Sequence, residues 1–176
     1  LLINEYGLCH DNPVDERRRV ALVRLVENLK LRGVPLDIVG IQGHLELAKG
    51  ALPQARLKSF FDDLAATGVK IALTEVDVLE DDRSLPLQER DAKVANAFAD
   101  LMDVARDSTA VTSVATWGLS DRDSWLQDRA EETKVALNAS SIASYDLNRG
   151  LPFDSAMQSK PMSREVGLRF GKRTFA

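Results

Sequence analysis

The sequence has little of what several protein classes depend on. Its single cysteine, Cys9, excludes an intrachain disulfide framework and a metal site built on paired cysteines. Its only histidines, His10 and His44, lack the paired spacing of a zinc-binding helix. No apolar run reaches the ~20 residues of a membrane-spanning helix. We therefore expect neither a metal or other cofactor nor a membrane partner.

The sequence also has no excess of basic over acidic residues. The formal net charge of −4 gives no reason to expect nucleic acid as a partner. No Gly-x-Gly-x-x-Gly motif follows a predicted strand, which argues against a dinucleotide cofactor. The chain opens directly on LLINEYG, a stretch typical of the inside of a strand, so we expect a fragment of a longer protein.

What the 176 residues do contain is a repeated pattern of an apolar strand followed by an amphipathic helix. Polar residues gather where the strands finish, as at the active-site end of a (β/α)₈ barrel. A doubly wound sheet follows the same rule, so this feature alone leaves both folds open. A complete barrel needs eight strands and ~250 residues. We predict an α/β fold that forms half of such a barrel, with residues 1–176 as one partial domain. The predicted strands are 1–3, 36–42, 71–73 and 110–118, and the predicted helices are 14–32, 53–67, 87–106 and 160–170.

Two carboxylates follow the third predicted strand. Glu75 comes at its end, and Asp77 is at the next position on the same face. Acids in such a loop are more often solvated or cap the next helix. An ionised carboxylate that is oriented and shielded from water can instead attack an anomeric carbon. His44, at the end of the preceding strand, favours this second interpretation, because an imidazole between the two acids could orient the nucleophile. A purely structural role, or a metal site, remains an alternative for His44.

The only two tryptophans, Trp117 and Trp125, lie within the short polar stretch WGLSDRDSW after the fourth strand. Core packing is the usual role of such large rings. The polar surroundings favour ring faces exposed in a cleft. We interpret them as walls of a saccharide subsite.

Several segments, taken together and in order, resemble the C-terminal half of family 10 glycoside hydrolases, the endo-1,4-β-xylanases. LLINEYG is similar to the strand-five motif of that family, with Glu5 for an aspartate and Gly7 for an asparagine. LPFD and Lys160-Pro161 resemble its closing segment. The other matching segments are GVPLDIVGIQGHL for strand six, GVKIALTEVDV for the nucleophile strand and TWGLSDRDSWL for strand eight.

The resemblance implies the C-terminal half of a (β/α)₈ TIM barrel and a role for each matched residue. Glu75 would be the nucleophile that forms a glycosyl-enzyme intermediate, oriented by a hydrogen-bonded relay of His44 and Asp77. The family hydrolyses internal β-1,4 bonds of xylan with retention of configuration and without a metal, so the expected partner is xylan or another β-1,4-glycan. Extracellular or periplasmic location is expected. The implied substrate-binding residues are Gln42 near the reacting sugar, Trp117 and Trp125 as walls, and Asn4 and Tyr6 on the leaving-group side.

The sequence also departs from the family. The general acid/base is a glutamate at the end of strand four, and that strand is not in this sequence. Glu5 does not replace it, because only one strand separates Glu5 from Glu75, whereas two separate the acid/base and nucleophile strands. Asn138-Ala139-Ser140, in a longer link than the family has, fits a glycosylation sequon.

These departures leave an alternative open. We expect this chain alone to be inactive, and a non-catalytic module that binds xylo-oligosaccharides is the second hypothesis. A half-barrel leaves sheet edges unpaired. We therefore expect it to pair with its missing N-terminal half or to self-associate.

Overall fold

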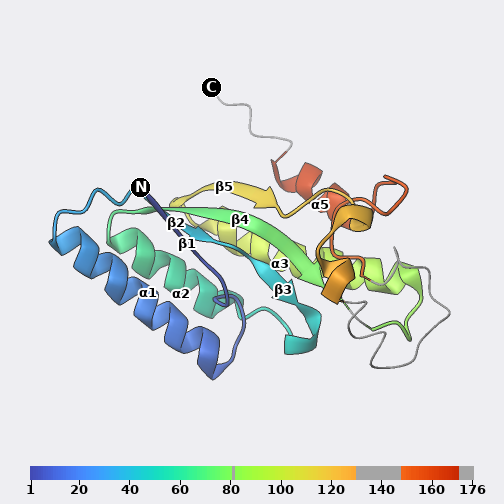
Figure 1. The fold of residues 1–176 in the computed structure, drawn as a ribbon, viewed down its shortest axis with the longest axis horizontal. Helices are drawn as coiled ribbons and strands as arrows, with labels where there is room; N and C mark the ends of the chain where they lie inside the picture. The colour runs from blue at the N-terminus through green and yellow to red at the C-terminus, as the bar shows by residue number, and fades with distance from the viewer. Residues whose placement is uncertain (81, 130–147, 171–176) are drawn as a thin grey trace. The chain divides into compact units, whose positions relative to one another are not determined.

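The computed structural model describes residues 1–80, 82–129 and 148–170 (Figure 1). The predicted sequon at Asn138 lies outside these residues. The structure divides into two compact units. The first unit comprises Leu1–Leu45, Lys49–Val76 and Asp100–Thr116, and the second comprises Glu46–Ala48, Asp77–Ala99 and Trp117–Ala176.

Strands and helices alternate along the chain, as the sequence predicts. Strand β1 pairs with β2, β2 with β4 and β4 with β5, each pair in parallel, so the predicted parallel sheet is confirmed. The sheet order is β1-β2-β4-β3, and β5 also pairs with β4. The strands are β1 (Leu2–Glu5), β2 (Ile38–Ile41), β3 (His44–Glu46), β4 (Lys70–Leu79) and β5 (Val111–Thr116). The helices are α1 (Pro13–Leu31), α2 (Gln54–Ala66), α3 (Leu87–Asp107) and α5 (Pro161–Phe170), with the short 3-10 helices η1 (Leu47–Lys49) and η2 (Asp121–Asp123).

Two details of the predicted strands are wrong. The third strand does not end before Glu75, because β4 continues to Leu79 with Val76 and Val78 fully buried. Alternating apolar residues extend the strand beyond the first acid. His44 does not end the second strand either, since β2 stops at Ile41 and His44 begins the separate strand β3.

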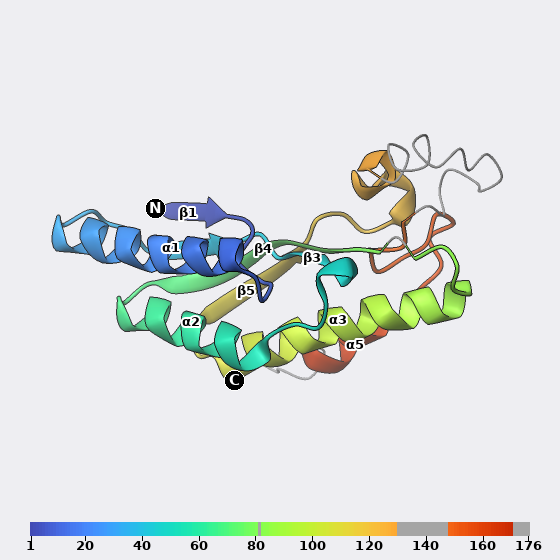
Figure 2. The same cartoon turned by 90° about the horizontal axis from the view of Figure 1, so that it is seen from below.

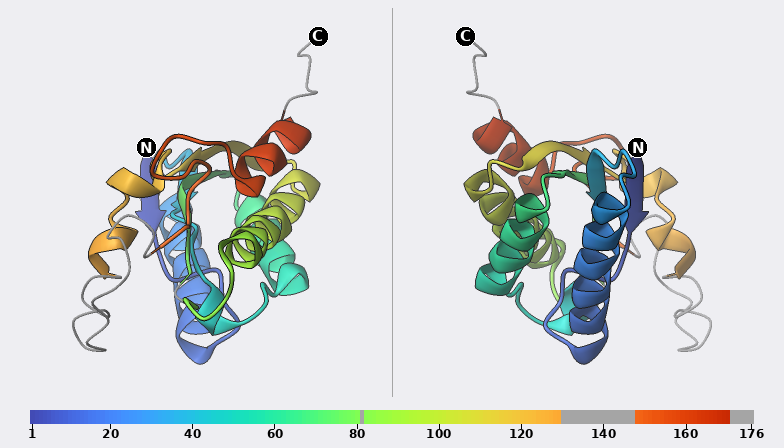
Figure 3. Two further views of the ribbon diagram at one scale, coloured as in Figure 1. Left: turned by 90° about the vertical axis from the view of Figure 1, so that its right-hand side faces the viewer. Right: turned by 90° about the vertical axis from the view of Figure 1, so that its left-hand side faces the viewer.

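Helices α1 and α2 lie side by side in the first unit (Figures 2 and 3). Helix α1 begins after Asn12, whose side-chain oxygen accepts hydrogen bonds from the backbone N–H groups of Val14 and Asp15 at 2.9 and 3.0 Å. Helix α2 buries Leu57, Phe61 and the rest of its apolar stripe. Together with the buried strand residues, this stripe forms the core of the first unit.

Two buried charges on α1 hold the loop between β1 and α1. The Asp15 carboxylate accepts a hydrogen bond from the backbone N–H of His10 at 2.8 Å. The Arg19 guanidinium donates to the carbonyl oxygens of Leu8 and His10 at 2.7 and 3.0 Å. Because buried backbone groups need partners, these side chains determine how the chain leaves the end of β1.

The thiol of Cys9 in this loop is buried, and burial raises its pKa to about 12. The Asp15 carboxylate adds to the rise, whereas Arg19 and Lys49 oppose it. At pH 8 the thiolate fraction is then roughly 10³-fold below that of a thiol with the ordinary pKa of 9.0. We expect iodoacetamide to label Cys9 at pH 8 only after urea unfolding, measured by mass spectrometry over time. Complete labelling of the folded chain within minutes would contradict this burial.

No helix in the described part of the chain is both long and apolar enough to cross a membrane.

Candidate active site

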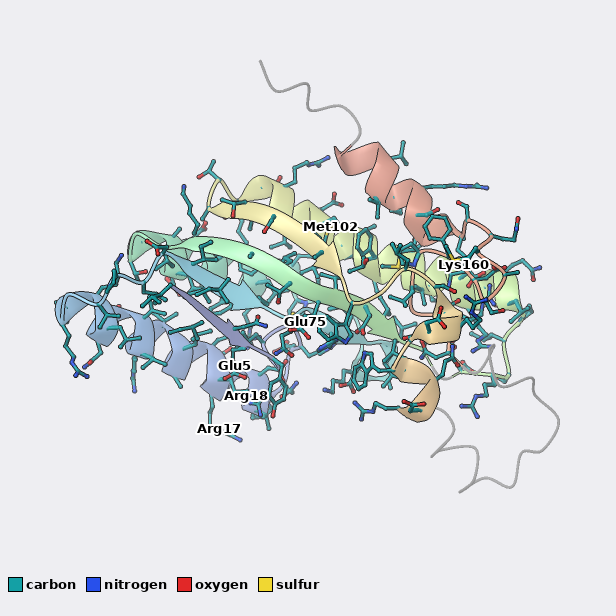
Figure 4. All side chains as sticks on the ribbon, turned by 45° about the horizontal axis from the view of Figure 1, so that its top comes forward. Glu5, Arg17, Arg18, Glu75, Met102 and Lys160 are labelled. Carbon is teal, nitrogen blue, oxygen red and sulfur yellow. The ribbon has the colours of Figure 1, made fainter. Side chains whose placement is uncertain are left out.

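Glu75 lies where its neighbouring strands end. The parallel register of the first three paired strands places Glu5 beside Ile41 and Ile41 beside Leu73. Beyond Leu73, β1 and β2 have ended, whereas β5 still pairs with β4 at Val76 after an irregularity in the register between Leu73 and Val76. The backbone N–H of Glu75 donates to the Gln42 carbonyl at 2.8 Å. Glu75 is thus held at the carboxyl end of the strands of the first unit (Figure 4).

Both carboxylate oxygens of Glu75 have a polar neighbour. The side-chain amide of Asn4 donates to Oε1 at 2.8 Å. His44 Nε2 lies 3.5 Å from Oε2, so a protonated imidazole would form an ion pair there. The Glu75 side chain is only 14% exposed. A carboxylate that is hydrogen-bonded at one oxygen, flanked by an imidazole at the other and shielded from water has a restricted orientation.

Asn4 is itself held in place. The Thr74 hydroxyl donates to Asn4 Oδ1 at 2.8 Å, which leaves the amide group of Asn4 directed at Glu75. Gly40 pairs with Asn4 on one side and with Ala72 of β4 on the other. A Cβ atom added at Gly40 would lie 2.5 Å from Asn4 Oδ1 and 3.2 Å from a Thr74 methyl carbon. The absence of a side chain at Gly40 is what allows this hydrogen-bonded row to form.

Tyr6 contacts Arg18 on α1. The guanidinium carbon of Arg18 lies 4.2 Å from the centre of the Tyr6 ring. Arg18 also donates to the Tyr6 carbonyl at 3.0 Å and to its hydroxyl at 3.3 Å, and the latter bond raises the pKa of Arg18. The Tyr6 ring, 54% exposed, is therefore fixed in orientation although it faces solvent.

Glu5 points to no catalytic partner in the first unit. Its carboxylate accepts a hydrogen bond from the backbone N–H of Tyr6 at 2.9 Å. The interpretation of Glu5 as a strand-five residue stays a prediction.

Three predicted site residues belong to the second unit. Asp77 is fully buried, and its Oδ2 accepts a hydrogen bond from the indole N–H of Trp125 at 2.6 Å. The guanidinium carbon of Arg129 lies 5.5 Å from the centre of the Trp125 ring. Trp117 follows β5 directly and is 49% exposed. The structure thus brings Asp77 and Trp125 together, and it leaves the Trp117 ring open to solvent.

The sequence analysis missed Thr74 and Arg18. The signal for Thr74 was its position directly before Glu75, but its bond to Asn4 depends on the register of strands far apart in sequence. Arg18 looked like one of several charges on a solvated helix face. The predicted site residues form no metal cluster, and no group of three or more metal-binding side chains occurs within residues 1–80, 82–129 and 148–170.

Comparison with known proteins identifies the family. Residues 1–167 match the family model described as glycosyl hydrolase family 10. Endo-1,4-beta-xylanase A of Phanerodontia chrysosporium is 31% identical over 174 residues, which cover 97% of this chain and 36% of that protein. Endo-1,4-beta-xylanase A of Thermoanaerobacterium saccharolyticum is 30% identical over 162 residues, which cover 92% of this chain and 12% of that protein. The chain therefore spans well under half the length of these relatives.

The chain is also similar in fold to solved xylanase structures. The intracellular xylanase TsXylA of Thermoanaerobacterium saccharolyticum is 28% identical with a TM-score of 0.68, over 94% of this chain and 43% of that one. Xylanase 10B of Thermotoga petrophila, solved with xylobiose, has a TM-score of 0.76 over 98% of this chain and 46% of that one, at 23% identity.

The parallel sheet with alternating helices, together with its likeness to the solved xylanase structures, identifies this chain as part of a (β/α)₈ barrel. The chain belongs to glycosyl hydrolase family 10.

Proposed function

We propose that this chain is the C-terminal half of the catalytic domain of a retaining endo-1,4-β-xylanase, with Glu75 as its nucleophile. One observation carries the proposal. The Glu75 carboxylate is shielded from solvent, accepts a hydrogen bond from the Asn4 amide at one oxygen and has His44 Nε2 3.5 Å from the other. A retaining glycosidase needs such a carboxylate to attack the anomeric carbon and form a covalent glycosyl-enzyme intermediate.

The other site residues have supporting roles in this proposal. His44 and Asp77 orient and tune the nucleophile. Gln42 contacts the reacting sugar. The substrate, xylan or another β-1,4-glycan, lies against Trp117 and Trp125 on one side of the cleaved bond, and Asn4 and Tyr6 approach its leaving-group side. The contact of Asn4 with Glu75 adds a second task for Asn4, which is to orient the nucleophile.

The general acid/base is the missing part. Retaining hydrolysis needs a second carboxyl group about 5–5.5 Å from the first, and we assign no residue of this chain to that role. Loss of general acid assistance typically costs about 10²–10⁴ in rate. We therefore propose that the chain is inactive alone and acts together with an N-terminal half that carries a strand-four glutamate.

The test is reconstitution. The chain is joined to the N-terminal half of a family 10 enzyme, and release of reducing sugar from xylan is measured. We expect hydrolysis by the joined domain and none by the chain alone, which we expect to self-associate in sedimentation. No hydrolysis by a joined domain that folds would refute the proposal.

The exposed Trp117 supports a second candidate function, a non-catalytic module that binds xylo-oligosaccharides. Calorimetry on the chain alone tests it. A module of this kind binds xylopentaose, loses affinity on Trp117→Ala and is indifferent to Glu75→Gln. Absence of heat at millimolar sugar rules this candidate out.

The proposed location is extracellular or periplasmic, because a polymeric substrate does not cross a membrane. TsXylA of Thermoanaerobacterium saccharolyticum, whose structure is similar to this chain, is an intracellular xylanase. Fractionation of the source cells decides between the two compartments.

A further inference from the structure

The second unit contains a buried ion cluster formed by Lys160, Asp121, Asp91 and Arg149. Lys160 Nζ donates to Asp121 Oδ2 at 2.6 Å and to the Arg149 carbonyl at 2.5 Å, and it lies 3.7 Å from Asp91 Oδ1. Arg149 donates to both Asp91 oxygens at 2.7 and 2.9 Å. All four side chains are at least 88% buried. Figure 4 shows Lys160 at the start of α5.

Such a cluster is costly for stability alone. Burial raises the pKa of Asp121 to about 6 although Lys160 and the Leu151 N–H oppose the rise, and burial lowers the pKa of Lys160. Apolar residues of similar volume often serve stability as well as a buried ion pair does, or better. We therefore explain the cluster by conformational specificity: its charges are all paired in one arrangement of the surrounding segments and would be unpaired in others.

That arrangement concerns the segment of residues 120–127, here called the Trp125 loop, which contains the short helix η2 and Trp125. Asp121 receives hydrogen bonds from the backbone N–H of Leu151 at its Oδ1, at 3.0 Å, and from the Gln127 side chain at its carbonyl, at 2.8 Å. Gln127 also donates to the Asn148 carbonyl at 2.8 Å. The loop is thus held four residues before Trp125 and two residues after it.

We propose that Lys160 is a positioning residue for the substrate subsite. Its buried ammonium group holds the loop in the arrangement in which Trp125 donates its indole proton to Asp77. Loss of this bond removes one constraint on the Trp125 ring, and it takes a hydrogen-bond donor from the fully buried Asp77. The assignment of the subsite rests on the proposed function, whereas the link from Lys160 to the indole bond does not.

The test uses Lys160→Met, which keeps much of the side-chain volume and removes the charge. Because Trp117 and Trp125 are the only tryptophans, the indole region of the proton–nitrogen NMR spectrum holds two signals, assigned with Trp117→Phe. We expect Lys160→Met to accelerate exchange of the Trp125 indole proton by roughly 10- to 100-fold. Backbone amides of residues 94–98 in α3 should keep their protection. Lys58→Met, at an exposed lysine paired with Asp62, is the matched control and should change neither.

Two results would overturn the proposal. One is an unchanged indole exchange rate in Lys160→Met. The other is a loss of protection shared equally by the α3 amides, which would make the role of Lys160 purely structural. If Lys160→Met does not fold, Asp121→Asn removes the partner charge and must show the same selective acceleration. In an Asp77→Asn background, Lys160→Met must add no further acceleration, because the bond it supports is already weakened.

A second readout tests the link to function. In the joined domain that hydrolyses xylan, we expect Lys160→Met to lower kcat roughly tenfold with little change in KM. If indole exchange is faster but kcat is unchanged, Lys160 positions Trp125 but has no role in the substrate subsite. Failure of the joined domain to hydrolyse xylan would refute the proposed function and leave the indole result standing.

Discussion

Glu75→Ala in the joined domain is expected to lower xylan hydrolysis by on the order of 10⁴- to 10⁶-fold, the loss seen when a covalent nucleophile is removed. The physical reason is that the proposed attack on the anomeric carbon loses its nucleophilic carboxylate. Reducing-sugar release under identical conditions measures the loss.

Added azide tests whether the missing carboxylate acted as the nucleophile. With an aryl xylobioside as substrate, azide can occupy the space left by the carboxylate and attack the anomeric carbon while the aryl group leaves with the bonding electrons. We expect the product to be a glycosyl azide of inverted configuration, seen by proton NMR. Glu27→Ala, at an exposed glutamate on α1, is the control and should keep full activity. Unimpaired hydrolysis by Glu75→Ala would refute the assignment of Glu75 as the nucleophile.

Gly40→Ala is expected to lower kcat by roughly 10²-fold, the usual cost of misplacing a catalytic group by about 1 Å. The new Cβ would lie 2.5 Å from Asn4 Oδ1, so Asn4 must move away from Thr74 and its amide must leave Glu75. Initial rates over a range of substrate concentrations separate this loss from a change in KM.

The matched control for Gly40→Ala is Gly167→Ala. An added Cβ at Gly167 meets no atom of the described residues within 4 Å, and alanine favours the helix in which Gly167 lies. This variant should retain activity and gain slightly in thermal stability. Equal kcat values for Gly40→Ala and the unmodified domain would show that the contact of Asn4 with Glu75 has no role in catalysis.

The fold was accessible from the sequence because its signals are local. Apolar runs predicted the strands that became β1, β2, β4 and β5. Asn12 at the start of α1 and Gly33 just after its end mark helix boundaries by their own chemistry. Strand β3 was missed because a strand of three residues is too short to show an alternating pattern of apolar and polar residues. The end of β4 was placed too early because Glu75 is an acid inside a strand rather than at its end.

The candidate site was accessible only in part. Residue type and position after a strand pointed to Glu75, and the structure places His44 and Asn4 against it. The Thr74–Asn4–Glu75 row depends on the register of β1 and β4 and on the open space at Gly40. The role of Lys160 in holding the Trp125 loop depends on side chains that meet only in the folded chain. Neither contact has a signature within a short stretch of sequence.

The most direct test of the account is to find which residue carries the sugar during turnover. The joined domain is mixed with an aryl xylobioside whose good leaving group makes the first step fast, so that the covalent intermediate accumulates before its slower hydrolysis, and the mixture is then quenched in acid and mapped by mass spectrometry. We predict a xylobiosyl adduct on the peptide that contains Glu75, and its absence in Glu75→Ala. An adduct on another carboxylate, such as Asp77, or hydrolysis with no covalent adduct, would contradict the account.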